Sequence, residues 1–238
     1  MTDAHQVLVS ASILNADFSR LDRVVHKLER AGADRLHLDV MDGNFVDNIT
    51  FGPDVVAAFR RLTDMPLDVH LMIAEPARYM DRFIAAGPQT ISFHVETTEP
   101  AEAKTAAIAA IHEAGQGAGL AVSPDTPVSA VDPWLSELDV ILMMSVYPGW
   151  GGQGFIPEAA PKIAEARARL AQAGRGGLVH VDGGVNSKTA DVVGAEGIDV
   201  CIVGSALFQR GSDASHEVEL VKERALAAHN AAVAVGSR

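Results

Sequence analysis

The chain contains 238 residues, a length that suits one large α/β domain or two small ones. Hydrophobic residues make up 48% of the chain and aromatic residues only 5%, so we expect an aliphatic core, as in a parallel sheet covered by helices. The formal net charge of −12 disfavours nucleic acid or an anionic membrane as a partner, and any phosphate group must be bound by local donors.

The cellular location is indicated by cysteine content and by the amino-terminal sequence. The single cysteine, Cys201, excludes an internal disulfide and fits a reducing compartment. The first ten residues, MTDAHQVLVS, lack the basic segment and long apolar run of a signal peptide. No apolar run reaches the roughly 18 residues that a membrane span needs. We therefore expect a soluble, cytoplasmic protein.

Short apolar segments alternate with helix-like segments along the whole chain. The expected strands are 6–14, 35–41, 67–73, 90–95, 117–122, 140–146, 177–184 and 199–208. Eight helices are expected between and after these strands. Four have expected ranges, 53–62, 101–114, 158–173 and 188–194. The other four are a helix that begins at about Asp17, one through Tyr79 and Phe83, a short one through Trp134 and a last one that begins near His216.

Eight strand–helix units in about 250 residues predict a single closed (β/α)₈ TIM barrel with a parallel eight-stranded sheet, forming one domain over residues 1–238. A doubly wound open sheet is the alternative. That fold would need fewer strands, and no GxGxxG turn follows the first strand.

Polar side chains occupy three expected strands near their carboxyl ends, where barrels place reactive groups. Alternation puts the members of each set on one face: His37, Asp39 and Met41; Asp68, His70 and Met72; and His180 with Asp182. Burying two acids and two histidines costs several kcal/mol unless they are compensated. A divalent cation would compensate them, and such ligands suit Zn²⁺, Mn²⁺, Fe²⁺ or Co²⁺ without choosing among them.

Plainer interpretations apply to several of these residues. A lone histidine in a strand is usually a core residue, and we interpret His94 and His180 in this way, with His180 supporting Asp182. Asp42 follows the strand end and is expected to form a turn. Met41, Met72 and Met144 fit either ordinary core packing or an apolar lining over the site.

Glycines cluster in the last three loops: Gly149, Gly151, Gly152 and Gly154 around Trp150, then Gly183 with Gly184, then Gly204 before Ser205. Glycine lets the backbone approach a ligand closely, and the loops after strands seven and eight of barrels commonly bind phosphate. None of these clusters contains Lys or Arg, so the donors would be mainly backbone amides. The alternative is that the glycines only form tight turns. The long loop after the sixth strand could also act as a lid.

Seven segments carry a family resemblance over about Ser10 to Phe208. They are SILNADF, LHLDVMDGNFVDNITFGP, DVHLMI, FHVE, SVYPGWGGQGF, VDGGV and VGSALF, in this order. Together they closely resemble the ribulose-phosphate 3-epimerase family. The resemblance implies a (β/α)₈ barrel that interconverts D-ribulose 5-phosphate and D-xylulose 5-phosphate in the pentose phosphate pathway.

The resemblance also implies roles for individual residues. His37, Asp39, His70 and Asp182 would bind a divalent metal, and Asp39 and Asp182 would also be the catalytic acid and base. The substrate would contact Ser12, His70, Asp182, Gly149, Trp150, Gly151, Gly152, Gly183, Gly184, Gly204 and Ser205. The chain departs from the family at Tyr147 (usually Asn), Trp150 (usually Phe) and Ser123 (often Asn), which leaves loop dynamics and sugar preference open. An epimerase for a six-carbon ketose phosphate is therefore an alternative.

Epimerisation at C3 needs one proton removed from one face of the carbon and another delivered to the opposite face. Two carboxyl groups facing each other across the barrel mouth would suffice, one ionised and one protonated. The metal would bind the substrate's C2 and C3 oxygens and stabilise an enediolate. No organic cofactor is required, and a homo-oligomer is left open.

Two further functions compete with this hypothesis. Barrel lyases and decarboxylases share the phosphate end, and some carry a D-x-K-x-x-D motif on a strand. The comparable position here reads Asp39-Val40-Met41-Asp42 and has no lysine. A non-catalytic phosphate or metal binder would not need two opposed acids.

Overall fold

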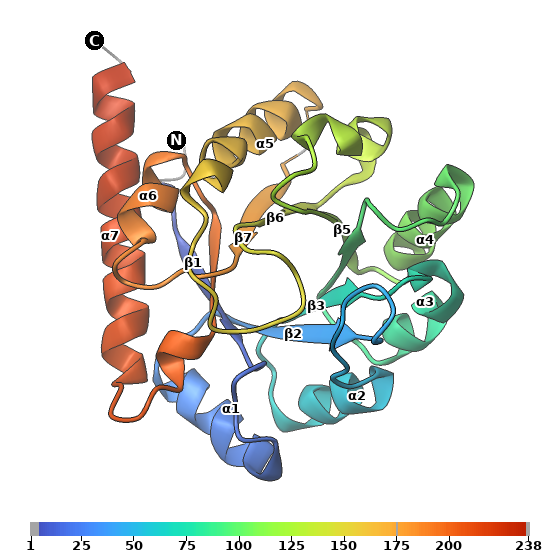
Figure 1. The fold of residues 1–238 in the computed structure, drawn as a ribbon, viewed down its shortest axis with the longest axis horizontal. Coiled ribbons are helices and arrows are strands. Elements are labelled where there is room, and N and C mark those ends of the chain that lie inside the picture. The colour runs from blue at the N-terminus through green and yellow to red at the C-terminus, as the bar shows by residue number, and fades with distance from the viewer. Residues whose placement is uncertain (1–4, 175, 237–238) are drawn as a thin grey trace.

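The computed structural model describes residues 5–174 and 176–236 and shows a closed parallel barrel with strand order β1 to β8. The ends of the expected 1–238 domain, including the first four residues of the segment assessed as a signal peptide, lie outside the described residues. Figure 1 shows the sheet at the centre with helices around it. The expected (β/α)₈ barrel is confirmed.

The strands agree with the expected segments and are shorter at some ends. They are β1 (Leu8–Ser12), β2 (Arg35–Met41), β3 (Leu67–Met72), β4 (Thr90–His94), β5 (Gly117–Val122), β6 (Val140–Met144), β7 (Leu178–Asp182) and β8 (Val200–Val203).

The helices follow the same alternation. They are α1 (Leu21–Arg30), α2 (Pro53–Leu62), α3 (Pro76–Ala85), α4 (Ala101–Glu113), α5 (Pro161–Gln172), α6 (Ala190–Ala195) and α7 (Ala214–Gly236). Four short 3₁₀ segments among the described residues complete the elements: Phe18–Arg20, Val128–Glu137, Pro157–Ala159 and Ser205–Leu207. The segment expected as a short helix through Trp134 is one of these, with the indole buried and its Nε1 donating to Thr105 Oγ1.

The alternation of β2 separates two environments. Leu36, Leu38 and Val40 belong to the main apolar core, which is built from strand and helix side chains. The intervening residues His37 and Asp39 are equally buried but join a polar cluster. A strand of this barrel can therefore carry an apolar outer row and a polar inner row, because successive side chains leave opposite faces.

Strand register brings the polar inner residues together. Asp39 pairs with His70 across β2 and β3, and Met144 pairs with Asp182 across β6 and β7. Asp68, two residues before His70, has different partners. Arg35 donates to it through Nε and Nη2 at 2.6–2.9 Å, and Ser10 and Thr90 donate their hydroxyls. Asp68 is thus a structural acid, bound by these groups and outside the four-residue cluster.

No helix among the described residues is both long and apolar enough to cross a membrane.

The packing of α6 against α7 gives a stability prediction. A Cβ added at Gly194 would lie 2.2 Å from the carbonyl oxygen and 2.5 Å from the Cα of Ala225 on α7. We expect Gly194→Ala to lower the free energy of unfolding by about 1–3 kcal/mol or more, because backbone must move. Gly176→Ala is the matched control, since an added Cβ there meets nothing within 4 Å. Urea unfolding measures both, and equal stability of the two variants would contradict the packing argument.

Candidate active site

Four side chains from three strands converge at the carboxyl end of the barrel. His37 and Asp39 come from β2, His70 from β3 and Asp182 from β7, and one ligand atom of each lies within 4.8 Å of the others. Asp39 Oδ1 lies 3.3 Å from His37 Nε2 and 3.2 Å from His70 Nδ1. Asp182 Oδ2 lies 4.0 Å and 3.8 Å from the same two nitrogens. The structure therefore brings together the four residues that the resemblance implied as ligands.

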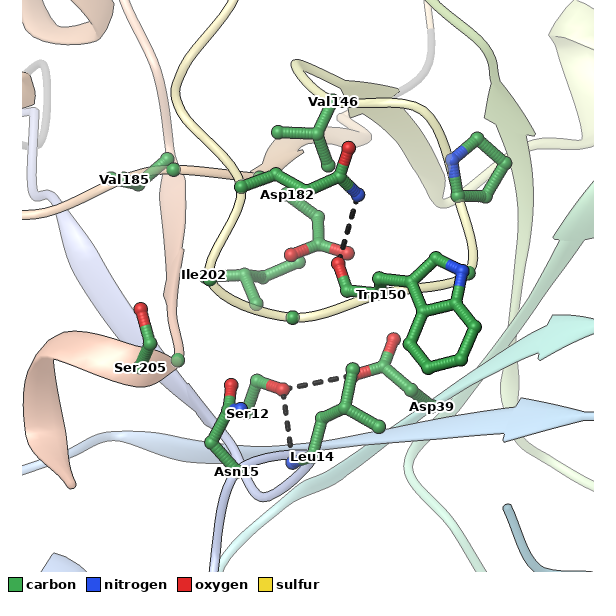
Figure 2. Close-up of a pocket in the computed structure, with 18 of the residues that line it drawn as sticks. Ser12, Leu14, Asn15, Asp39, Val146, Trp150, Asp182, Val185, Ile202 and Ser205 are labelled. Atoms are coloured by element: carbon green, nitrogen blue, oxygen red, sulfur yellow. Dashed lines mark hydrogen bonds between the residues drawn. The ribbon is translucent and has the colours of Figure 1, made fainter. Parts of the chain in front are cut away.

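The two aspartates approach a common space from opposite walls. Figure 2 shows Asp39 and Asp182 pointing into the cavity from different strands. The Ser12 hydroxyl donates to Asp39 Oδ2 at 2.8 Å, which orients that carboxylate. Asp182 has a more open side chain, 18% exposed against 4% for Asp39. The two acids are therefore in different environments: Asp39 is buried and oriented by Ser12, and Asp182 is more exposed to the cavity.

The same asymmetry appears in the pKa values of the two acids. Burial would raise the pKa of Asp39, but the neighbouring imidazoles of His37 and His70 outweigh burial and hold that pKa far below its usual range. Burial, together with the negative charge of Asp39, raises the pKa of Asp182 to about 7. Two close carboxyl groups in one site resist being ionised together. Near neutral pH, Asp39 is therefore ionised, and Asp182 is divided between its two forms.

The residues present fit a divalent cation. Both ring nitrogens of His37 are buried without a hydrogen-bond partner. Burial would lower the pKa of His37, but the charges of Asp39 and Asp182 outweigh it and raise the pKa to about 9. A field that favours a positive charge on this ring equally favours a cation bound by it. Two imidazoles and two carboxylates suit Zn²⁺, Mn²⁺, Fe²⁺ or Co²⁺.

A cavity of about 210 Å³ opens above the cluster. It contains all the glycines implied to contact substrate, together with Ser12, Trp150 and Ser205, and among its lining residues there is no Lys or Arg. Close approach of backbone requires glycine at Gly184, where an added Cβ would lie 2.4 Å from the backbone nitrogen of Phe155. At Gly151 the neighbour at 2.4 Å is Asn15 Oδ1, which is the far end of a side chain. The loops after β1, β6 and β7 thus pack tightly at one end of the cavity.

The loop after β6 is exposed at the cavity mouth. The side chains of Tyr147 and Trp150 are 52% and 60% exposed. Tyr147 Oη donates to Asp125 Oδ2 at 2.9 Å, which joins this loop to the segment after β5. Gln153 Nε2 donates to the carbonyl oxygens of Tyr147 and Trp150 at 2.7 and 2.9 Å. The loop therefore has internal order while its aromatic residues face solvent.

The three methionines line the cavity in two groups. Met41 and Met72 pack with Val46, whereas Met144 packs with Leu142, Val146 and Ile202 in a second group. All three lie along the cavity wall, so they are both packed and part of its lining. Asp42 forms a turn as expected, because its carboxylate accepts from the backbone nitrogens of Asn44, Phe45 and Ala74.

The structure confirms His94 as a buried strand residue outside the four-residue cluster, and it adds a contact with the site that was not expected. The Nε2 of His94 lies 3.0 Å from His70 Nε2, and its Nδ1 lies 2.9 Å from Glu96 Oε2. The signal was present, since His94-Val95-Glu96 repeats the histidine–acid spacing of His37 and Asp39. His180 does lie outside the four-residue cluster, and burial lowers its pKa to about 4.

Several further cavity residues, most of them on loops, were not predicted from the sequence. Asn15, Gln153, Asn186 and Gln209 add polar side chains to the lining, and Val185 and Ile202 add apolar ones. Loop amides of this kind have no periodicity that separates them from ordinary surface residues.

Comparison with known proteins agrees with these features. Residues 8–208 match the model of the ribulose-phosphate 3 epimerase family. A ribulose-phosphate 3-epimerase of Bacillus subtilis is 45% identical over 203 residues, covering 85% of this chain and 92% of the relative. The chloroplastic ribulose-5-phosphate-3-epimerase of Arabidopsis thaliana is 42% identical over 229 residues, covering 96% and 80%.

Solved structures with the same fold have more distant sequences. A 3-hexulose-6-phosphate synthase from Salmonella typhimurium superposes with a TM-score of 0.68 at 17% identity, covering 94% of this chain and 100% of that one. A 3-keto-L-gulonate-6-phosphate decarboxylase from Vibrio cholerae gives 0.65 at 12% identity, covering 92% and 97%. These likenesses concern the barrel alone.

The cluster makes a prediction for cation binding. Co²⁺ at about 100 times its Kd should raise the free energy of unfolding by about 2.7 kcal/mol, because it binds the folded state. His37→Gln should lose most of this gain, whereas His26→Gln, at an exposed helix position, should retain it. Urea midpoints with and without Co²⁺ measure the effect. An unchanged wild-type midpoint, or equal gains in both variants, would contradict the assignment.

Proposed function

The chain belongs to the ribulose-phosphate 3-epimerase family, and we propose that Asp39 and Asp182 perform its proton transfers beside a bound divalent cation. The family assigns the chain an isomerase activity that interconverts D-ribulose 5-phosphate and D-xylulose 5-phosphate. The observation that carries the proposed mechanism is the placement of two unlike acids on opposite walls of one cavity, within 4.8 Å of two histidines.

The two acids divide the chemistry between them. Asp39 is ionised, oriented by Ser12, and able to accept the C3 proton from one face of the substrate. Asp182, with a pKa near 7, can hold a proton and deliver it to the other face. In the reverse direction the roles exchange. Each turnover therefore leaves one carboxyl protonated and the other ionised, with solvent access through Asp182 to restore the starting state.

The remaining residues bind and orient the substrate. We assign the phosphate end to the cavity side formed by Gly149 to Gly152, Gly183, Gly184, Gly204 and Ser205, with backbone amides as the main donors. We assign the sugar end to the part of the cavity where Ser12 lies beside Asp39 and where Met41, Met72 and Met144 form the wall. His70 contacts Asp39 from behind this lining. A divalent cation held by His37, Asp39, His70 and Asp182 would supply Lewis-acid stabilisation of the negative charge that develops on the substrate oxygens.

Two alternatives to this activity can be tested by experiment. A six-carbon ketose phosphate stays an alternative substrate, because Tyr147 and Trp150 differ from the usual family residues at the cavity mouth. A lyase or decarboxylase activity has support only from the shared barrel fold, and the Asp39–Asp42 segment lacks a lysine. Incubation with ribulose 5-phosphate in D₂O separates these possibilities, since an epimerase incorporates deuterium at C3 and forms xylulose 5-phosphate without carbon–carbon cleavage.

Asp39→Asn and Asp182→Asn test the two-acid assignment. Each should reduce kcat by about 10²- to 10⁴-fold, the range for a positioned acid or base. Asp54→Asn, at an exposed position in the first turn of α2, should leave kcat unchanged. Steady-state assays measure kcat, and circular dichroism checks the fold. Near-normal turnover by either site variant would refute the assignment.

Removal of the cation tests the other half of the mechanism. Dialysis against a strong chelator should abolish epimerisation, and addition of Zn²⁺, Mn²⁺, Fe²⁺ or Co²⁺ should restore it, because the developing charge would otherwise lack a counter-ion. Metal content and activity are measured on the same samples. Full activity in a metal-free preparation would show that another group stabilises this charge.

Two other expectations stay predictions. The cytoplasm is proposed as the location from the single cysteine, and cell fractionation tests it. A homo-oligomer is tested by light scattering.

A further inference from the structure

A buried histidine, His94, and a partly buried glutamate, Glu96, lie behind His70. His94 on β4 is fully buried, with its Nε2 3.0 Å from His70 Nε2. Its other nitrogen, Nδ1, lies 2.9 Å from Glu96 Oε2. Phe45 stacks against the His94 ring at a centroid separation of 4.7 Å. Glu96, His94 and His70 thus form a chain of contacts that ends at the cation site.

The direction of the hydrogen bonds in this chain is set at Glu96. Its Oε1 accepts the backbone N–H of Ser123 at 2.7 Å. Burial would raise the pKa of Glu96, but the hydrogen bonds and charge of its partners outweigh burial and lower the pKa to about 2. An ionised carboxylate only accepts hydrogen bonds. His94 must therefore carry a proton on Nδ1, because an unprotonated Nδ1 would place two acceptors 2.9 Å apart.

The tautomer of His94 determines that of His70. A neutral imidazole carries one N–H, so a proton on Nδ1 of His94 leaves a lone pair on its Nε2. The 3.0 Å contact is then a hydrogen bond only if His70 donates from its own Nε2. A neutral His70 that donates from Nε2 has no proton on Nδ1. Its Nδ1 therefore has a free lone pair, directed at the space shared with Asp39 and Asp182.

We propose that Glu96 and His94 are positioning residues that hold His70 in the Nε2–H tautomer, so that its Nδ1 lone pair faces the cation site. The 3.2 Å contact of Nδ1 with the ionised Asp39 then joins two electron-rich atoms, which a bound cation would stabilise. The inference rests on the proposed metal site, and it adds the reason why His70 presents the correct nitrogen. Hydrogen-bonded partners of metal-binding histidines commonly contribute 10- to 100-fold in metal affinity.

Glu96→Gln is the sharpest variant, because it keeps the shape and reverses the hydrogen bonds. The Ser123 N–H still needs an acceptor, so the amide oxygen takes the Oε1 position and the amide nitrogen faces His94 Nδ1. His94 then donates from Nε2, and His70 carries its proton on Nδ1, facing Asp39. We expect Co²⁺ to bind about 10- to 100-fold more weakly, measured by competition with a chelator of known affinity.

Asp139→Asn is the matched control. Asp139 Oδ2 contacts His112 Nε2 at 2.8 Å and accepts the backbone N–H of Ala118 at 2.9 Å, so this pair resembles His94–Glu96 but lies away from the cavity lining. The Co²⁺ affinity of this variant should equal that of the wild type, because the same charge is removed without a link to His70.

Ring ¹⁵N NMR of the metal-free proteins reports the His70 tautomer directly. If Glu96 and His94 had only a structural role, this tautomer would not change. Wild type should show His70 as the Nε2–H tautomer, and Glu96→Gln should show the Nδ1–H tautomer. A wild-type His70 protonated at Nδ1 overturns the proposal even if the variant fails to fold. Unchanged Co²⁺ affinity in Glu96→Gln, or weaker binding with an unchanged His70 tautomer, also overturns it. A wild type that binds no Co²⁺ would instead refute the proposed metal site, and the two failures are thus distinguishable.

Discussion

The burial of two carboxylates and two histidines in one corner of an aliphatic barrel is the constraint on which the site depends. Removing these groups from water is costly unless opposite charges or hydrogen bonds compensate them. Asp68 shows the internal solution, since Arg35, Ser10 and Thr90 satisfy it fully. The cluster around Asp39 has no arginine or lysine within its contacts, and His37 has no hydrogen-bond partner. This difference separates a structural acid from one prepared for a cation.

The end of the cavity that we propose for the substrate's phosphate has the opposite electrostatic problem, because it must hold negative charge without a cationic side chain. A chain with a net charge of −12 offers a dianionic substrate little long-range attraction, and the cavity lining includes no Lys or Arg. If the phosphate binds at the proposed end of the cavity, selectivity must come from short-range geometry, with the packed loops supplying the donors. The backbone contact that excludes a Cβ at Gly184 shows how tightly the loops after β6 and β7 are packed. Binding at such a site depends on backbone position more than on charge.

Much of the architecture could be predicted because strand periodicity is a local property. The alternation of His37, Asp39 and Met41 was sufficient to place them on one face, and the strand-end glycines marked the cavity. Contacts between side chains of different strands are harder to predict from the sequence. The link between His70 and His94 depends on barrel curvature and on the register of β3 with β4, neither of which a single sequence reveals. Loop residues such as Asn15 and Asn186 lack any repeating signal, so they were found only in three dimensions.

The two tryptophans occupy contrasting environments. Trp134 is buried between the outer elements and hydrogen-bonded to Thr105, whereas Trp150 is exposed on the loop at the cavity mouth. A collisional quencher dissolved in the buffer therefore reaches one indole and not the other. The quenchable fraction of the intrinsic fluorescence comes from the mouth alone, so the chain carries its own optical label for following how that loop responds when ligand arrives.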